Sequence, residues 1–369
     1  MEKMLNKFIE KNIDKKGFHD YLINSYSPML KNYYLKYDIK TYNEIVGEEE
    51  FQYSLHKFME KECIDLFEFC NKNDINIIGL KGIFIEKQFW STPRYYNDID
   101  VIVDMNKIDK LYNYFSEKGT YKLVENRNYN PFKRQNTSLS KMLNVNLNKI
   151  NHIVLWNENE ELLLNDLDHV EIEIHGCFDT FDIVNIDDKS MFNDCITFEN
   201  FNVLNYESQI LYLIYHTIHH LPYIRHNLTG LYVEINRFID VALVILNSEI
   251  NWDKFEKLCA IHTMSPLCSL YFKMFIEIFP NIMPDSVIRR VDLETQNVNF
   301  KWKKTYLRLM KMNALDLIIG NFNDFPEIEK PYLKIKKYIL RERFNNKYIL
   351  KLAMELWKIE LSKIHANLE

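Results

Sequence analysis

Residues 75–104 combine a short apolar run, two glycines around a lysine, and a second apolar run that opens with two aspartates. The run from Ile75 to Gly79 is bounded by turn residues and predicts a buried strand. Gly79 and Gly82 bracket Lys81 at the end of that strand, in a chain with only 8 glycines. Because glycine lets the backbone approach a ligand closely, we expect this turn to point amide groups at an anion.

The second run, residues 97–103, predicts a strand that carries two carboxylates on one face. Side chains alternate along a strand, so Asp98 and Asp100 point to one side while the aliphatic residues point to the other. A carboxylate pair suits Mg²⁺, which takes oxygen ligands and leaves positions for waters and substrate phosphates. Lys81 and Arg94 are cations of the kind that bind a polyphosphate. The combination predicts phosphoryl or nucleotidyl transfer.

The order of these residues also resembles a known superfamily. The run Leu80-Lys81-Gly82, then Arg94, then Asn97-Asp98-Ile99-Asp100, is similar to the DNA polymerase β-like nucleotidyltransferases. It resembles most the uncharacterised bacterial nucleotidyltransferase family, in which a Lys-Gly turn replaces the more usual Gly-Ser. The abortive-infection and toxin-type transferases with a Lys-Gly-Gly turn are similar here too. One Asp-x-Asp triplet arises by chance on polar strand faces, whereas the ordered set of turn, arginine and acid pair is much more specific.

A further strand is predicted over residues 170–175, where polar and apolar residues alternate strictly. Glu171, Glu173 and His175 share one face, as they would on the exposed side of an edge strand. The resemblance favours a catalytic role, because in polymerase β-like transferases a third acid arrives on a neighbouring strand. The family often has an acid two residues before a histidine at this point. Glu173 is the matching acid and His175 the family's histidine, with Glu171 as the fallback.

Helical sequence flanks this predicted core on both sides. Residues 1–70 are expected to form an N-terminal helical segment that packs on the sheet, with a substrate-capturing lid as the alternative. Residues 71–200 are expected to form the α/β (α+β) nucleotidyltransferase core with a mixed sheet that the resemblance implies. Residues 201–369 are expected to form a C-terminal helical domain. Within the core, residues 107–119 predict a helix closed by a glycine, and residues 120–148 an irregular insertion.

Two histidines of the C-terminal part, His216 and His220, are four residues apart and so share one helix face, a spacing that can bind zinc. No glutamate follows His216 and no cysteine is near, so zinc is the lesser interpretation. In the resembled family a helix with a histidine pair precedes an Arg/Asp segment, which Arg237 and Asp240 match. These residues either face the nucleotide or acceptor, or tie the helices together. The structural role is preferred for Asp240 and both roles stay open for His220.

Charge and composition narrow the partners and the compartment. The net charge of −6 and the pI near 6.0 disfavour a large nucleic-acid surface. The basic runs at 301–304 and 334–337 are typical of solvated helix faces. The six cysteines form no Cys-x-x-Cys pair, the start lacks an apolar signal core, and no apolar run reaches the ~20 residues that span a bilayer. We therefore expect a cytoplasmic protein with reduced thiols and no membrane partner.

Residues and resemblance together predict a metal-dependent nucleotidyltransferase that uses Mg²⁺, with Mn²⁺ as the alternative. The expected catalytic and metal-binding residues are Asp98, Asp100 and Glu173. The expected nucleotide-binding residues are Gly79, Lys81, Gly82, Arg94 and His175. For Lys81 and Arg94 the alternative is a solvated surface charge.

The expected reaction moves a nucleoside monophosphate from a nucleoside triphosphate to an acceptor and releases pyrophosphate. A small-molecule, peptide or protein acceptor is favoured over nucleic acid because the chain is acidic. Two alternatives stay open. One is a catalytically silent nucleotide-binding or scaffold protein, which the intact acids disfavour. The other is a toxin-type transferase acting on tRNA, which needs a basic groove.

Overall fold

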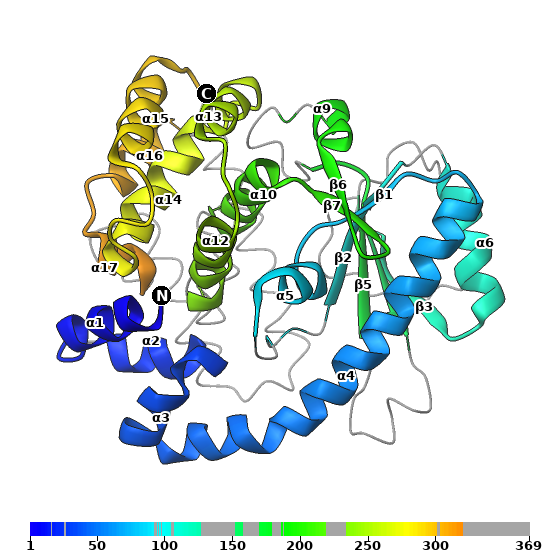
Figure 1. Cartoon of the computed structure of the whole chain (residues 1–369), viewed down its shortest axis with the longest axis horizontal. Coiled ribbons are helices and arrows are strands. Elements are labelled where there is room, and N and C mark those ends of the chain that lie inside the picture. The colour runs from blue at the N-terminus through cyan, green and yellow to red at the C-terminus, as the bar shows by residue number, and fades with distance from the viewer. Residues whose placement is uncertain are drawn as a thin grey trace, which may run out of the picture. The chain divides into compact units, whose positions relative to one another are not determined.

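The computed structural model divides the chain into two compact units (Figure 1). The described residues are 1–15, 17–25, 27–91, 94, 96, 98–104, 107–126, 152–157, 170–178, 186, 188–218, 234–300 and 303–319. The first unit comprises Met1–Ser25, Leu213–Ala242 and Thr263–Glu369, and the second Tyr26–Tyr212 and Leu243–His262. The three-part division at residues 70 and 200 stays a prediction.

A mixed sheet forms the centre of the second unit. It has 7 strands in the order β3-β4-β5-β2-β1-β7-β6. The strands are β1 (Ile77–Gly79), β2 (Asp98–Val103), β3 (Tyr121–Asn126), β4 (His152–Asn157), β5 (Val170–His175), β6 (Cys195–Phe198) and β7 (Phe201–Leu204). Strand β2 pairs antiparallel with β1 and parallel with β5, so the strand that carries Glu173 is the neighbour of the acid strand that the resemblance implied. The mixed sheet with its helices confirms the predicted fold class.

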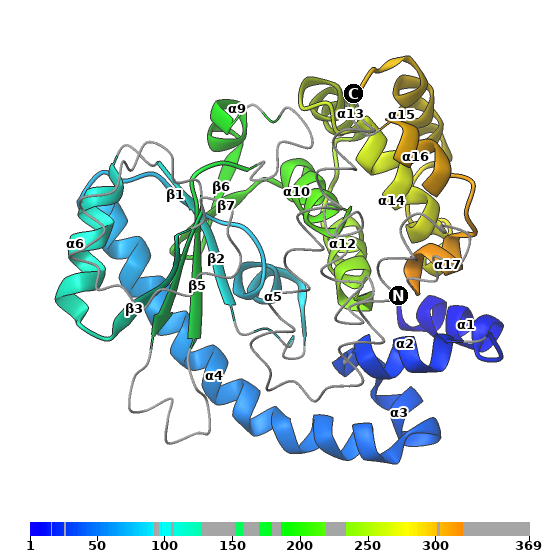
Figure 2. The ribbon, with the colours of Figure 1, turned by 180° about the vertical axis from the view of Figure 1, so that it is seen from behind.

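The helices of the second unit include α3 (Lys31–Tyr37), α4 (Ile39–Lys72), α5 (Ile83–Phe89), α6 (Ile108–Lys118), α9 (Asp188–Asn193) and α13 (Trp252–Ile261). Of these, α4, α5 and α6 contribute residues to the apolar core beside the sheet. Figures 1 and 2 show α4 and α6 on the same side of the strands. As predicted, α6 ends at Gly119, whose φ of 71° is the left-handed conformation that closes helices.

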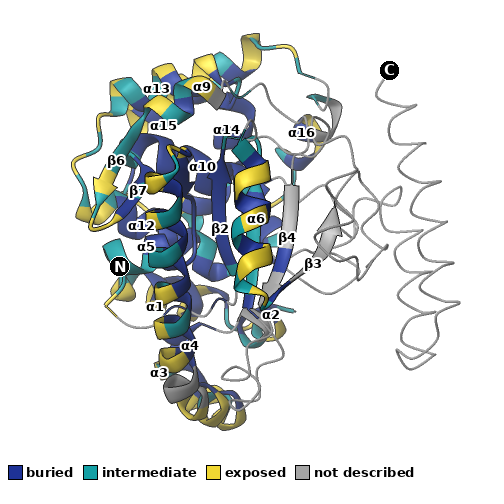
Figure 3. Ribbon diagram, turned by 90° about the vertical axis from the view of Figure 1, so that its right-hand side faces the viewer, coloured by how far each residue is buried: buried dark blue, intermediate teal, exposed yellow. Residues whose placement is uncertain are grey.

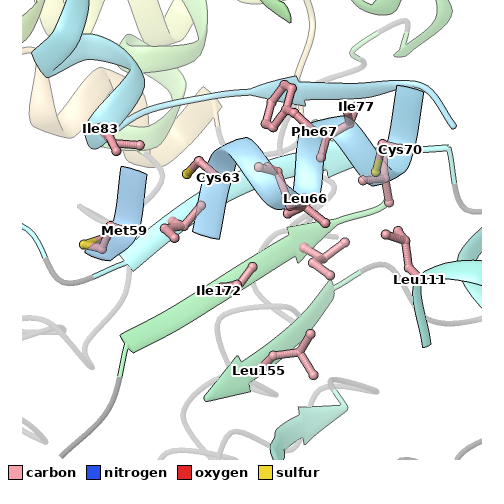
Figure 4. Packing of buried hydrophobic residues seen from close by; sticks show 14 of the residues in the cluster. Met59, Cys63, Leu66, Phe67, Cys70, Ile77, Ile83, Leu111, Leu155 and Ile172 are labelled. Carbon is pink, nitrogen blue, oxygen red and sulfur yellow. The ribbon is translucent and has the colours of Figure 1, made fainter. Parts of the chain in front are cut away.

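The core between α4, α6 and the sheet holds β2 in place. Met59, Cys63 and Leu66 on α4 are fully or almost fully buried over the strands, as Figure 4 shows. Ile99 and Val101 of β2 belong to the same cluster. Figure 3 shows the strand buried while α6 keeps an exposed outer face. Each large aliphatic side chain buried this way stabilises the fold by about 1.5–3 kcal/mol, so the orientation of β2 is strongly fixed.

The irregular insertion predicted over residues 120–148 is wrong at its start. Tyr121–Asn126 forms β3, which pairs antiparallel with β4 at the edge of the sheet. Polar residues interrupt this run and its register shifts between Leu123 and Glu125, so the alternation that marks a strand is weak. Residues 127–148 lie outside the described part of the chain.

The β6–β7 hairpin is a second feature that the sequence pattern did not predict. Its turn contains Glu199, whose φ of 50° lies in the left-handed region that usually favours glycine or asparagine. Without a glycine at the turn, the usual hairpin signal is missing. The hairpin extends the sheet beyond β1, because β7 pairs parallel with β1 at Gly79 and Val203.

The first unit is helical within its described residues. Its helices include α1 (Glu2–Asn12), α2 (Phe18–Ser25), α14 (Ser265–Ile278), α15 (Asp285–Asn297), α16 (Lys303–Leu309) and α17 (Ala314–Ile318). The unit boundary falls within α10 (Tyr206–Ile218) and α12 (Ile235–Asn247). Helices α16 and α17 are separate, because Asn313 caps the start of α17 by accepting from Leu315 N–H at 2.8 Å. None of the helices in the described ranges has the length and apolarity needed to cross a membrane.

Candidate functional site

Strands β2 and β5 bring four carboxylates to one face of the sheet. Their parallel register places Asp98 opposite Glu171 and Asp100 opposite Glu173. The aliphatic residues between them point to the opposite face, where α4 and α6 bury them. The alternation predicted for each strand is observed, and the two acid rows lie side by side because the strands are hydrogen-bonded neighbours.

Asp100 is the deepest member of this set. Its side chain is 0% exposed, whereas that of Asp98 is 26% exposed. His175 lies beside it, with Nε2 3.2 Å from Asp100 Oδ1 and 3.6 Å from Glu173 Oε2. Of the predicted acids, Asp100 and Glu173 therefore adjoin the predicted histidine directly.

The donor atoms of this group fit a divalent cation. Asp100, Glu173 and His175 each offer a ligand atom, and these atoms all lie within 4.8 Å of one another. Carboxylate oxygens suit Mg²⁺ and Mn²⁺, and an imidazole nitrogen is a common additional ligand for transition metals. The predicted set was Asp98, Asp100 and Glu173, whereas the structure groups His175 with the last two and places Asp98 against Lys81.

Lys81 places its ammonium group between the two aspartates. Its Nζ is 2.8 Å from Asp98 Oδ2 and also forms an ion pair with Asp100 Oδ2. Burial opposes the charge of Lys81, but Asp100, Asp98 and Glu173 outweigh it and raise the pKa of Lys81 well above its usual range. Since the residue is only 8% exposed, it is not a solvated surface charge.

The turn after β1 holds Lys81 against the acid strand. Leu80 N–H donates to the backbone carbonyl of Asp100 at 3.1 Å, which extends the strand pairing into the turn. Gly82 has a φ of 63°, and a Cβ there would lie 3.3 Å from the Asp98 carbonyl and 3.5 Å from the Tyr96 ring. Both the backbone conformation and the space therefore favour glycine at this position.

Packing explains the first glycine of the turn, Gly79. A Cβ on Gly79 would overlap the ring of Phe84 in the first turn of α5. That ring also contacts Phe67 and Phe201, with centroid distances of 5.6 and 5.4 Å. Gly79 thus lets an aromatic cluster approach β1 closely. Gly79 was predicted to bind the ligand, and packing against the Phe84 ring is a structural alternative to that role.

Arg94 belongs to a buried polar cluster next to the turn. It is 8% exposed, and its guanidinium carbon lies 5.8 Å from the centre of the Tyr96 ring. On the same ring His56 stacks at 4.3 Å, while Glu86 accepts a hydrogen bond from the Tyr96 hydroxyl and lies 3.0 Å from His56 Nδ1. Burial, with Glu86, raises the pKa of Tyr96 well above its usual range. Arg94 is therefore held beside the Gly82 turn and is not a solvated surface charge.

Sequence reasoning missed Tyr212, a buried residue whose pKa is influenced by the acids. Burial first, and then Asp100, raise the pKa of Tyr212 well above its usual range, with Lys81 opposing. The hydroxyl thus stays protonated near the carboxylates. Tyr212 lies on α10, whose residues 208–215 are all buried, so no amphipathic pattern singles it out. Its i, i+4 spacing from His216 is the signal that could have found it.

Glu171, the predicted fallback acid, has a distinct electrostatic environment. Burial and the neighbouring Glu173 raise the pKa of Glu171 to about 7, and Asp98 adds to the shift. The group therefore exchanges a proton near neutral pH, unlike an ordinary glutamate.

The Arg/Asp segment in the other unit has a structural explanation. Arg237 Nη1 donates to the backbone carbonyl of His216 at 3.1 Å and lies 3.2 Å from His216 Nδ1. Carbonyls in the last turn of a helix lack helical partners, so this contact caps α10. Tyr271 donates to the Arg237 carbonyl at 3.3 Å, and burial and then Asp240 raise the pKa of Tyr271. His220 lies outside the described residues, so the histidine pair stays a prediction.

A comparison with known families matches the same part of the chain that contains this site. A family model described as an uncharacterised nucleotidyltransferase matches residues 49–280, which is more than half of the chain. The matched region contains the lysine turn, Arg94, both acid strands and Tyr212. No protein with a curated description matches the chain.

Proposed function

Because the chain belongs to the uncharacterised nucleotidyltransferase family, we propose that it moves a nucleoside monophosphate from a nucleoside triphosphate to an acceptor in the cytoplasm. The observation that carries the proposal is the single sheet face on which Asp98, Asp100 and Glu173 meet Lys81 and His175. Acids that can hold a divalent cation and a cation that can bind phosphate are the two components this chemistry needs.

The reaction requires little covalent chemistry from the protein. An acceptor oxygen forms a bond to the α-phosphorus, the bond to the β-phosphate oxygen breaks, and pyrophosphate leaves. Mg²⁺ or Mn²⁺ held by Asp100 with Glu173 and His175, and with Asp98 beside them, would stabilise the charge on the reacting phosphates. Lys81 and the Gly82 turn would orient the triphosphate tail.

One further acid of this face would accept a proton in this proposal. The acceptor hydroxyl loses its proton as it attacks, and Glu171 is placed to accept it because it lies opposite Asp98 on the acid face. Burial and Glu173 also raise the pKa of Glu171 in the metal-free protein.

A small molecule, peptide or protein is the proposed acceptor. The net charge of −6 supports this choice over bulk nucleic acid. Of the two basic runs that would favour tRNA, 334–337 lies outside the described residues and 301–304 lies partly outside them. The buried and paired acids support catalysis over a silent scaffold, because an unused cluster of buried charge lowers stability.

The proposal is tested by following the α-phosphate. Each of the four triphosphates, radiolabelled at the α-phosphate, is incubated with the protein, Mg²⁺ or Mn²⁺, and separate small-molecule and protein fractions of a cell extract. Label should pass to one fraction as pyrophosphate is released. Asp100→Asn should reduce transfer on the order of 10²-fold or more, about 2.7 kcal/mol of barrier.

Asp109→Asn is the matched control, since Asp109 is an exposed acid on α6. Its transfer rate should equal that of the wild type. Equal transfer by the folded Asp100→Asn variant would contradict the site. Binding of a triphosphate without transfer to any fraction would favour the silent nucleotide-binding protein.

A further inference from the structure

Both carboxylate oxygens of the buried Asp100 already have partners. Oδ1 lies 3.2 Å from His175 Nε2, and Oδ2 forms an ion pair with Lys81 Nζ. Because Asp100 is 0% exposed, no open side remains from which a cation could approach Oδ2. A divalent ion that uses this oxygen must take the place of the ammonium group.

Lys81 also neutralises the second aspartate. Its Nζ lies 2.8 Å from Asp98 Oδ2, so one ammonium group bridges the acid pair. Burying two carboxylates without a counter-charge is strongly unfavourable, so the bridge stabilises the site in this state. A bound divalent ion would supply that counter-charge itself, and the ammonium and the metal would then repel each other at short range.

We propose that Lys81 is an exchangeable internal cation, which neutralises Asp98 and Asp100 in the metal-free protein and leaves Asp100 when a divalent ion and a triphosphate bind together. This inference rests on the proposed function and adds to it a coupling between metal binding and nucleotide binding. The lysine stem has four flexible carbons, and the neighbouring Gly82 allows the turn to adjust. The phosphate tail provides the negative charge to which the ammonium moves.

Metal and nucleotide binding are thereby coupled. A metal ion alone must displace Lys81 from Asp100 and then lies close to its ammonium group, which repels it, so metal alone binds weakly. A triphosphate accepts the displaced ammonium, so each ligand strengthens the binding of the other by the same factor. The device keeps the acid pair from holding a metal ion unless a nucleotide is present.

The direct test is Mn²⁺ binding without nucleotide, measured from the electron paramagnetic resonance signal of free Mn²⁺. Lys81→Met removes the internal cation and keeps the length of the side chain. Its affinity for Mn²⁺ should exceed that of the wild type by about tenfold or more, because a positive charge within a few ångströms is gone. Equal or weaker binding by Lys81→Met would overturn the proposal.

Lys87→Met is the matched control. Lys87 lies on α5 and, like Lys81, pairs with two carboxylates, Glu60 at 2.5 Å and Glu199 at 3.2 Å. Neither partner of Lys87 belongs to the acid face of β2 and β5, so removing Lys87 should leave the Mn²⁺ affinity unchanged. If both variants gain Mn²⁺ affinity equally, the gain comes from the lower positive charge of the whole protein, and the exchange at Lys81 is contradicted.

A second variant keeps the test decisive if Lys81→Met does not fold without metal. Lys81→Gln retains a hydrogen-bond donor for Asp98 and Asp100 but carries no charge, and should show the same gain in affinity. Adding a non-hydrolysable ATP, GTP, CTP or UTP analogue should then strengthen Mn²⁺ binding more in the wild type than in Lys81→Gln. An equal increment in both would contradict the coupling.

These outcomes separate the exchange from the proposed function. The titration without nucleotide reports on Lys81 and the acids, whatever reaction the protein carries out. If it shows the gain but no triphosphate binds, Lys81 still competes with the metal for the acids, whereas the coupling to nucleotide and the nucleotidyl transfer both fail. If triphosphates bind with Mn²⁺ but Lys81→Met and Lys81→Gln show no gain, only the exchange fails.

Discussion

At the scale of single residues, the acids of β2 and β5 differ in burial and therefore in task. Asp100 is closed off, paired on both oxygens, and fixed by the strand beneath it. Asp98 and Glu173 keep 26% and 22% of their side chains exposed, so ligands can reach them. Glu171 lies in the same row but exchanges its proton near neutral pH. One sheet face thus contains acids suited to holding charge and an acid suited to moving a proton.

Glu171 should make the metal-free protein less stable as the pH rises. Its pKa is raised from 4.5 to about 7 in the folded chain, chiefly by burial and then by Glu173. Between these pH values the folded form holds a proton that the unfolded form has lost, so the free energy of unfolding falls through this window. We expect Glu171→Gln to remove about 1–2 kcal/mol of that decline, allowing for partial solvent screening.

Urea unfolding at intervals across this pH range checks the prediction. Glu10→Gln replaces an exposed acid of α1 and should leave the wild-type pH dependence intact. A Glu171→Gln curve that still declines as steeply as the wild type would show that another group is responsible.

The two glycines best suited to comparison are Gly82 and Gly47. Gly82→Ala should lower the free energy of unfolding by about 1–3 kcal/mol, because the left-handed backbone and the close Asp98 carbonyl both disfavour a side chain. Gly47 lies within α4 with open space around its Cβ position, so Gly47→Ala should raise stability by about 0.5–1 kcal/mol. Denaturant unfolding of both variants measures the two changes in the free energy of unfolding. Changes of the same sign in both variants would contradict the prediction.

At the scale of elements, the sheet around the acids is explained better by sequence than its edges are. The turn glycines, the acid alternation and the Gly119 helix end are local signals, and the structure has each of them. Strand β3 pairs with β4, and β7 with the distant β1, while their local patterns are weak. The sequence therefore predicted an irregular insertion in place of β3 and did not predict the β6–β7 hairpin. Long-range pairing is the information that a single sequence conceals.

The site shows the same division between local and distant information. The spacing of Asp98 and Asp100 along one strand predicts that they share a face, whereas Tyr212, whose pKa they influence, comes from a helix more than a hundred residues later. Tyr96 is adjacent in sequence to the acid strand, but its partners His56 and Glu86 come from α4 and α5. Only the packing of these helices on the sheet brings His56 and Glu86 to Tyr96, which lies beside Gly82 of the turn.

The contact of α4 and α5 with the turn can be tested through Tyr96. Tyr96→Phe keeps the ring beside Arg94 but removes the hydrogen bond to the partly buried Glu86. Leaving that acceptor unpaired should lower the free energy of unfolding by about 1–3 kcal/mol. The lost hydrogen bond also helps to hold the Tyr96 ring under Arg94. Because Arg94 is expected to bind the triphosphate, KM for the triphosphate should rise more than kcat falls.

Tyr53→Phe is the control, since Tyr53 lies on the same helix α4 and is 56% exposed. Its unfolding midpoint and its KM should match those of the wild type. Unchanged stability and KM in Tyr96→Phe would mean that this hydrogen bond does not support the turn.

At the scale of the whole molecule, the chain combines a sheet-containing unit with a helical one, and each has its own core. The complete acid face, the lysine turn and Tyr212 belong to the unit built from Tyr26–Tyr212 and Leu243–His262. The family match covers residues 49–280 and so includes described parts of both units. The acidic net charge is a property of the whole chain and sets the expectation of an acceptor other than bulk nucleic acid.

The measurement that tests the central claim most directly is calorimetric binding of ATP, GTP, CTP and UTP, each with and without Mg²⁺. Wild-type protein should bind at least one triphosphate only when Mg²⁺ is present. The Asp98→Asn/Asp100→Asn variant, with its fold checked by circular dichroism, should lose that binding, because it lacks the acids that hold the metal against the phosphates. Metal-dependent binding that survives in the variant, or no binding of any triphosphate by the wild type, would contradict the account.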